Sequence, residues 1–333
     1  MAVVLVLDDD GSLAHAVPII TAATSPQRTP IQSMGAMLAP FAEIACAVGP
    51  QLSWFGMADS EQTPVEREDP SVIRPRALKG RVAIVTGGGT GIGLAIAKRL
   101  GELGATIVFG SRNSANLEQG SAELRRAGYD SLACQVDVRK PDQVDEMVHR
   151  TIHHYGHVDI LVNNAAGNFI CRAEELSPNG WNAVIGSVLN GSFYCSRAVG
   201  KQMIERGAGG SIVSVLANYV WTGSAGTVHS AAAKAGVMSM TQTLAVEWAR
   251  YKIRVNAVAP GPIESPGAAQ QLWNSPEAVA RIAATVPLQR WGHASEVADA
   301  VAFLVSDHAA FITGETLTVD GGAWLGRGTY GFV

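Results

Sequence analysis

From residue 81 onward, short runs of β-branched and other apolar residues alternate with longer segments whose apolar residues recur at helical spacing. Runs that are apolar on both faces are typical of parallel strands covered by helices on each side of the sheet. The pattern therefore predicts an α/β fold, a doubly wound parallel sheet of seven strands in a single domain. The expected strands are 82–85, 106–109, 132–136, 160–162, 212–215, 255–258 and 317–319.

The N-terminal part of the chain has a different character. Residues 1–77 are rich in Ala, Pro, Ser and Thr, contain no lysine and show no sustained periodicity, so we expect a poorly ordered extension before a folded domain at 78–333. Asp8, Asp9 and Asp10 stand where a signal peptide carries positive charge, which argues against secretion. A translation start at Met34 or Met57 is an alternative interpretation of this segment.

The composition excludes several classes of function. A formal net charge of −4 and dispersed lysines give no basic surface for a nucleic acid. No apolar run reaches the roughly 18 to 20 residues of a membrane helix, so we expect no membrane span. The four cysteines lack CxxC spacing; we expect reduced thiols, no metal site and, by default, a cytoplasmic protein.

A glycine-rich turn joins the first predicted strand to a predicted amphipathic helix at 92–103. In that context Gly87 permits a tight turn, Gly91 lets the backbone approach a pyrophosphate, and Gly93 lets helix and strand pack closely. Glycine clusters are often only turns, and that alternative stays open on this motif alone.

Further motifs resemble the short-chain dehydrogenase/reductase family over residues 78–325. They are TGxxxGxG at 86–93, Asn-Asn-Ala-Ala-Gly at 163–167, a helical Lys234 and Pro-Gly-Pro-Ile at 260–263. The resemblance implies a Rossmann fold in which Lys234 holds the nicotinamide ribose, Ile263 borders the carboxamide and Asp137 faces the adenine. It also places Thr90, Ile92, Ser111, Asn164, Pro260 and Gly261 at the cofactor.

The end of the second predicted strand bears on the choice of cofactor. Phe109-Gly110-Ser111-Arg112 contains no carboxylate to accept the adenosine 2′-hydroxyl, whereas Arg112 suits a 2′-phosphate. We therefore predict NADPH rather than NADH. A surface arginine beside a loop is also common without any ligand.

The residues before Lys234 depart from the usual pattern of the family. Members commonly have a tyrosine four residues before the lysine and a serine thirteen before that tyrosine, but here these places hold Ser230 and Ala217. A serine hydroxyl is a far weaker acid than a phenol, so ordinary ketone reduction loses its proton donor. Either the chain binds cofactor without catalysis, or the donor has moved.

A displaced tyrosine supports the second interpretation. Tyr219 precedes Lys234 by fifteen residues, Asn168 follows Ala-Ala-Gly, and the chain carries Asp-Gly-Gly-Ala-Trp-Leu at 320–325. Together with Ser230 these features resemble 2,4-dienoyl-CoA reductases; the tyrosine is similar to the mitochondrial type, and His229 to the peroxisomal type. The resemblance implies that Tyr219, Asn168, Lys234 and Ser230 are catalytic.

The chemistry of such a reaction fits these residue types. Hydride addition at C5 of a 2,4-dienoyl thioester moves electrons onto the thioester oxygen, which then needs hydrogen-bond donors such as the Tyr219 hydroxyl and the Asn168 amide. Protonation at Cα gives a 3-enoyl-CoA. Two alternatives remain, a 3-oxoacyl-ACP type of ketoreductase and a non-catalytic NADPH-binding subunit.

The same resemblance implies that Arg139, Phe169 and Ser177 contact the acyl-CoA. The chain differs from the family at Gln271, eleven residues after the first proline of Pro-Gly-Pro-Ile, where the family has an arginine. Glutamine cannot match the charge-assisted bonds of arginine to phosphate, so CoA binding is weaker unless Arg281 or Arg290 compensates. The family also implies a homotetramer.

Overall fold

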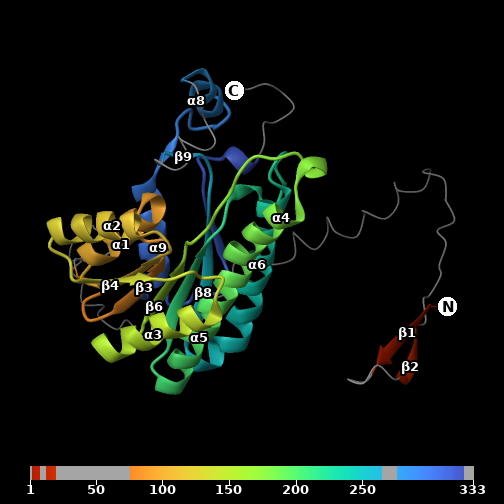
Figure 1. Cartoon of the computed structure of the whole chain (residues 1–333), viewed down its shortest axis with the longest axis horizontal. Coiled ribbons are helices and arrows are strands. Elements are labelled where there is room, and N and C mark those ends of the chain that lie inside the picture. The colour runs from red at the N-terminus through yellow and green to blue at the C-terminus, as the bar shows by residue number, and fades with distance from the viewer. Residues whose placement is uncertain (1, 8–12, 20–75, 265–275, 326–333) are drawn as a thin grey trace, which may run out of the picture. The chain divides into compact units, whose positions relative to one another are not determined.

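The computed structural model describes residues 2–7, 13–19, 76–264 and 276–325, which belong to two separate units, Met1–Arg67 and Glu68–Val333. In the first unit, β1 (Ala2–Leu7) pairs antiparallel with β2 (Leu13–Ile19) (Figure 1). This hairpin was not predicted from the sequence, although the β-branched run of β1 favours a strand. The prediction of poor order elsewhere in 1–77 concerns residues outside the described ones.

The second unit contains the predicted parallel sheet, in the order β11-β8-β7-β6-β3-β4-β5. Each pair of neighbours is parallel, and the order reverses between β3 and β6, as in a doubly wound fold. All seven predicted strands are confirmed. They are β3 (Val82–Thr86), β4 (Thr106–Ser111), β5 (Ser131–Gln135), β6 (Ile160–Asn163), β7 (Gly210–Val215), β8 (Ile253–Pro260) and β11 (Thr316–Val319).

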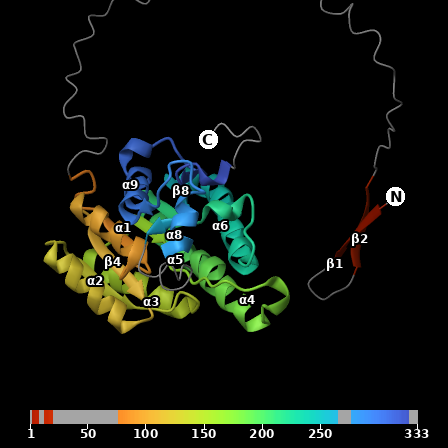
Figure 2. The same ribbon diagram turned by 90° about the horizontal axis from the view of Figure 1, so that it is seen from above.

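Helices cover both faces of the sheet (Figure 2). Alternate residues of β3 point to opposite sides: Ala83 and Val85 pack with α1 and α9, whereas Val82 and Ile84 pack in the cluster that includes residues of α3 and α5. These two apolar layers explain why the strands are hydrophobic throughout. The helices are α1 (Gly91–Glu102), α2 (Ser114–Arg126), α3 (Pro141–Tyr155), α4 (Pro178–Ile185), α5 (Gly191–Arg206), α6 (Val228–Trp248), α8 (Pro276–Ala283) and α9 (Ala294–Val305).

Two further features complete this unit. Beyond the main sheet, β9 (Ile263–Glu264) pairs in parallel with β10 (Gly292–His293) and begins at the last residue of the Pro-Gly-Pro-Ile motif. Among the residues that the structure describes, no helix is both long and apolar enough to cross a bilayer.

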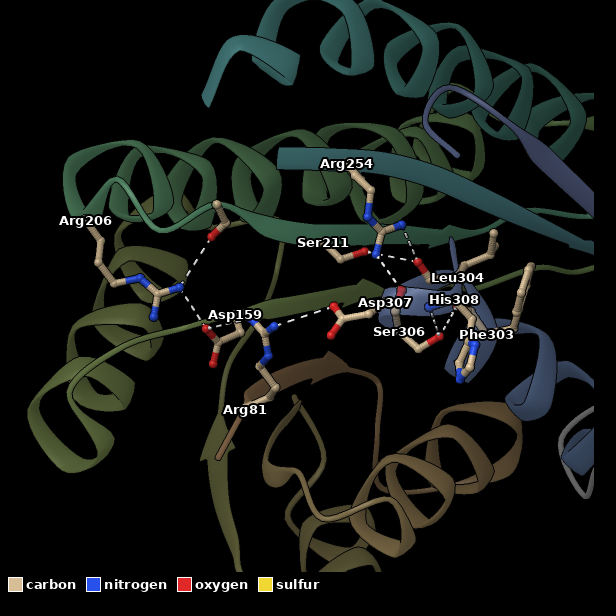
Figure 3. Close-up of polar contacts among 11 residues, drawn as sticks. Arg81, Asp159, Arg206, Ser211, Arg254, Phe303, Leu304, Ser306, Asp307 and His308 are labelled. Carbon is tan, nitrogen blue, oxygen red and sulfur yellow. Dashed lines mark hydrogen bonds and ion pairs between the residues drawn. The ribbon is translucent and has the colours of Figure 1, made fainter. Parts of the chain in front are cut away.

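A polar network links elements that meet at the amino-terminal edge of the sheet (Figure 3). The buried Asp159 carboxylate accepts hydrogen bonds from the Val82 backbone N–H at 2.8 Å and from the Arg206 guanidinium at 2.7 Å. Arg81 lies 3.7 Å from both Asp159 and Asp307. Because parallel strands share one direction, this network lies at the edge opposite to the glycine-rich turn that follows β3.

Candidate active site

The glycine-rich turn between β3 and α1 has the geometry of a phosphate cradle. Gly87 and Gly91 adopt φ of 65° and 54°, a region that favours glycine. A Cβ on Gly93 would lie 2.2 Å from the Gly87 carbonyl oxygen, so only glycine lets the start of α1 approach the turn. Asn164, after β6, donates from Nδ2 to the Thr86 and Gly87 carbonyls and so fixes the turn.

A pocket of about 610 Å³ opens beside this turn. Arg112 is exposed at its wall and forms no ion pair with the described residues, so its guanidinium is available to an anion. The size and the backbone amides at the α1 N-terminus fit a dinucleotide. The predicted cofactor residues that line the pocket are Gly87, Thr90, Gly91, Ile92, Gly93, Ser111, Arg112 and Asn164.

Asp137 and Arg139 were predicted to contact different ligands, but the structure pairs them with each other. Arg139 donates to both carboxylate oxygens of Asp137, from Nε at 2.9 and 3.0 Å and from Nη2 at 2.6 Å. The hydrogen bond from Arg139 lowers the pKa of Asp137. Their neighbours Val136 and Val138 line the pocket, so the pair stands just outside its wall.

Three of the predicted catalytic residues meet at the Tyr219 hydroxyl. Tyr219 lies in a short 3-10 turn (Asn218–Val220) after β7, and its oxygen is 2.9 Å from the Ser230 hydroxyl at the start of α6. Asn168, which follows β6 and lines the pocket, donates from Nδ2 to the same oxygen at 3.5 Å. Burial raises the pKa of Tyr219, which keeps the phenol protonated as a hydrogen-bond donor.

Lys234 lies one helical turn after Ser230 on the buried face of α6. Its Nζ donates to the Val215 carbonyl at the end of β7, and burial lowers its pKa to about 8. Pro260 is the last residue of β8, and Gly261 follows it. A Cβ on Gly261 would lie 2.5 Å from the Asp320 Cβ, so the chain passes close to Asp320 at this position. Ile263 is buried in β9.

Two of the predicted substrate residues lie close together, since a Cβ on Gly180 would be 3.1 Å from the Phe169 ring and 3.4 Å from the Ser177 Oγ. Phe169 is 38% exposed and packs against the fully buried His229, with ring centroids 4.4 Å apart. The Ser177 hydroxyl accepts from the Gly180 N–H and caps α4, so its position has a structural explanation as well. Gln271 lies outside the described residues.

The two cations suggested as substitutes for an arginine at 271 differ in availability. Arg290 forms a two-pronged ion pair with Glu296, at 2.8 and 2.7 Å, and would have to break it to bind phosphate. Arg281 of α8 is exposed and has no ion pair within the described part of the chain. Among these two residues, the Arg281 guanidinium is therefore the more available to a phosphate.

Sequence reasoning missed several features of the site. A π-helical turn (Gly186–Asn190) separates α4 from α5 and brings Ser187 to the pocket wall, and such turns often occur at functional sites. Asn218 donates to Asp320 at 3.0 Å and so ties the turn that carries Tyr219 to the C-terminal segment. No periodic pattern signals either feature.

Comparison with known proteins shows the family to which the chain belongs. A family model described as Enoyl-(Acyl carrier protein) reductase matches residues 87–323. A Bacillus subtilis protein named probable 2,4-dienoyl-CoA reductase, (2E)-enoyl-CoA-producing, is 47% identical over 74% of this chain and 98% of its own length. The chain belongs to the short-chain dehydrogenase/reductase family.

Other relatives extend the comparison. A peroxisomal 2,4-dienoyl-CoA reductase of Danio rerio, named (3E)-enoyl-CoA-producing, is 40% identical over 76% of this chain and 85% of its own. The crystal structure of a short chain dehydrogenase from Bacillus anthracis is 46% identical, with a TM-score of 0.69 and coverage of 76% of this chain and 99% of that one. The predicted fold and family are thus confirmed, and this short-chain dehydrogenase/reductase is an oxidoreductase with a nicotinamide cofactor.

Proposed function

We propose that this protein is an NADPH-dependent 2,4-dienoyl-CoA reductase that acts in the oxidation of unsaturated fatty acids. The observation that supports this function most is the meeting of Tyr219, Ser230 and Asn168 at one hydroxyl beside the cofactor pocket. Two relatives that bear this enzyme name cover most of the reductase domain. The tyrosine absent from position 230 is thus replaced by a donor from a different element.

Four residues of the site have separate roles in this reaction. The cofactor supplies a hydride to C5 of the diene when bound. The Tyr219 hydroxyl and the Asn168 amide then donate hydrogen bonds to the thioester oxygen, on which negative charge develops. Ser230, 2.9 Å away, orients the Tyr219 hydroxyl, and Lys234 supplies positive charge and a donor to the ribose.

The product depends on where the resulting dienolate takes up its proton. Protonation at Cα gives a 3-enoyl-CoA, and protonation at Cγ gives a 2-enoyl-CoA. The hydroxyl donors of the described site gather at Tyr219 and Ser230, which face the thioester oxygen in this mechanism. Because Cα is one bond from the thioester carbon and Cγ is three, we propose that a water molecule at these hydroxyls protonates Cα and gives the 3-enoyl product.

The proposal is tested with the purified protein, NADPH and hexa-2,4-dienoyl-CoA, with cofactor oxidation followed by absorbance and the product identified by NMR. We expect turnover to the 3-enoyl thioester and little with acetoacetyl-CoA. Turnover of acetoacetyl-CoA alone would favour a ketoreductase, and turnover of neither would favour a cofactor-binding subunit. A 2-enoyl product would refute protonation at Cα while leaving the reductase activity standing.

The preference for NADPH rests on Arg112. Replacing Arg112 by Ala removes a charged donor from the pocket wall, and one such hydrogen bond contributes about 1.5 to 3 kcal/mol. We expect KM for NADPH to rise about 10- to 100-fold while kcat/KM with NADH stays within twofold. Equal losses with both cofactors would mean that Arg112 does not recognise the 2′-phosphate.

A further inference from the structure

Large apolar side chains remain exposed on three segments that adjoin Tyr219. The first segment follows β6 and includes Asn168, the second is the loop 218–227 after β7, and the third follows β11. The Cys171 N–H donates to the Gly226 carbonyl at 2.9 Å, so the first two segments are in contact. The side chains concerned are Phe169, Ile170, Trp221, Trp324 and Leu325, with exposed fractions of 38, 58, 40, 37 and 71%.

Two of these side chains form a pair that is held beside the catalytic turn. The rings of Trp221 and Trp324, the tryptophan pair, have centroids 4.9 Å apart and planes at 35°. Trp221 ends the turn that carries Tyr219, so their Cα atoms are at most about 7 Å apart. One oxygen of Asp320 accepts from Asn218 Nδ2 at 3.0 Å and from the Trp324 N–H at 2.8 Å, which joins the two segments.

The charges around the tryptophan pair narrow the choice of ligand. The loop 218–227 contains no charged residue. The only one in the segment 320–325 is Asp320, a residue that is 9% exposed and whose carboxylate is engaged in hydrogen bonds. Nothing in these two segments attracts the phosphates of CoA. Two exposed indole rings without a charged neighbour in these segments, close to Tyr219, instead suit a hydrocarbon chain.

We propose that the tryptophan pair binds the alkyl tail of the acyl chain, beyond the diene, and gives the enzyme a preference for longer dienoyl thioesters. The inference rests on the proposed function, because it concerns the same substrate and the same site. It assigns a role to Trp221 and Trp324 that neither hydride addition nor binding of the thioester requires.

The size of the expected preference for longer substrates follows from the hydrophobic effect. Each methylene group removed from water favours binding by about fourfold. Deca-2,4-dienoyl-CoA has four methylenes more than hexa-2,4-dienoyl-CoA, and the two rings cover only part of their surface. We therefore expect kcat/KM for the ten-carbon substrate to exceed that for the six-carbon one by about tenfold in the unaltered protein.

We define the chain-length ratio as kcat/KM for the ten-carbon substrate divided by kcat/KM for the six-carbon substrate. The experiment compares this ratio in Trp221→Ala, Trp324→Ala and the full-length unaltered protein. The ratio is independent of the fraction of enzyme that folds, because both substrates meet the same preparation. We expect each variant to lower it at least threefold while kcat/KM for the six-carbon substrate stays within about twofold. Trp324→Phe should keep most of the ratio, and Phe311→Ala, at a fully exposed ring elsewhere, should leave it unchanged.

Three outcomes would overturn the inference. One is an unchanged ratio in both alanine variants. Another is an equal loss for both chain lengths, accompanied by a change of oligomeric state, which would assign the pair to a subunit contact. The third is a loss in the alanine variants that is equal for both chain lengths with CoA thioesters and disappears with pantetheine thioesters, which would mean that the rings stack on adenine. Absence of turnover with either chain length in the unaltered protein would instead refute the proposed function.

Discussion

At the scale of single residues, burial sets the protonation of the two groups that we propose to act in catalysis. Tyr219 is partly buried and its pKa is raised, whereas Lys234 is buried and its pKa is lowered to about 8. Both shifts have the same cause, since removal from water disfavours the charged form of each group. The site thus holds a phenol that stays neutral and an amine whose charge is sensitive to pH.

Replacing Tyr219 by Phe removes one hydroxyl donor and keeps the ring. Loss of an oxyanion donor costs about 3 to 4 kcal/mol of transition-state stabilisation, so kcat should fall about 10²- to 10³-fold. KM for NADPH should change little, as measured by steady-state kinetics with hexa-2,4-dienoyl-CoA. Tyr129→Phe, at a ring that packs beside Gly101, serves as the matched control and should be close to unaltered. A near-normal kcat in Tyr219→Phe would refute the oxyanion role.

Lys234 should give the enzyme an alkaline limit. Its pKa falls from the ordinary 10.5 to about 8, so the folded protein loses this positive charge as pH rises through about 8. We expect kcat/KM for NADPH to be level below pH 7 and to decline above pH 8. The Lys234→Arg variant stays charged and should lack the decline, whatever its absolute rate. An unaltered protein with a level profile up to pH 9.5 would contradict the assignment.

Whereas activity should decline as pH rises, the stability of the folded protein should increase because of the same pKa shift of Lys234. Between pH 8 and 10.5 the unfolded chain keeps the Lys234 proton that the folded protein has lost, so the unfolded state binds more protons. The contribution of Lys234 to the free energy of unfolding therefore rises with pH in that window. The difference between unaltered protein and Lys234→Met in urea titrations at pH 7 and 10 measures it.

At the scale of elements, the site depends on loops held to one another across the carboxyl ends of the strands. Asn164 from the β6 segment fixes the β3 turn, and Asn168 from the same segment reaches Tyr219 after β7. The C-terminal segment contributes through Asp320, which binds Asn218. Short polar side chains thus position the donors that the regular elements bring only roughly together.

The link between Asn218 and Asp320 offers a test of this positioning. Asn218→Ala removes the side-chain donor next to Tyr219, while Asp320 keeps its bonds to the backbone of Gly322 and Trp324. One hydrogen bond contributes about 0.5 to 1.5 kcal/mol, so we expect kcat to fall about 2- to 10-fold. KM for NADPH should stay unchanged, because the glycine-rich turn is not involved. A rise in that KM without loss of kcat would point to general loosening instead.

At the scale of the whole molecule, the edge of the sheet remote from the pocket carries stability rather than chemistry (Figure 3). Asp159 joins the start of β3 to the end of α5 and also lies 3.0 Å from His157 Nε2. Loss of one partner from a buried ionic network leaves the other charges uncompensated. This edge therefore holds the sheet together from the side that has no cofactor pocket.

Asp159→Ala should lower the free energy of unfolding by about 3 kcal/mol in urea titrations. The matched control is Asp145→Ala, which breaks an exposed pair with Arg197 at 3.5 Å and should cost less than about 1 kcal/mol. Equal effects of the two changes would mean that the buried network contributes no more than a surface pair. The homotetramer and the cytoplasmic location stay predictions, to be measured by sedimentation and by fractionation of cells.

The sequence by itself determined the sheet, the glycine-rich turn and the family, because these depend on local period and on motifs within one segment. It also indicated that Tyr219, Asn168 and Ser230 act together, through resemblance alone. Only the tertiary structure showed that they meet at one hydroxyl, that Arg139 pairs with Asp137 and that Asp320 binds the turn that carries Tyr219. The physical reason is that side chains far apart in sequence meet only after helices and strands pack, and no periodicity in one segment records the partner found in another.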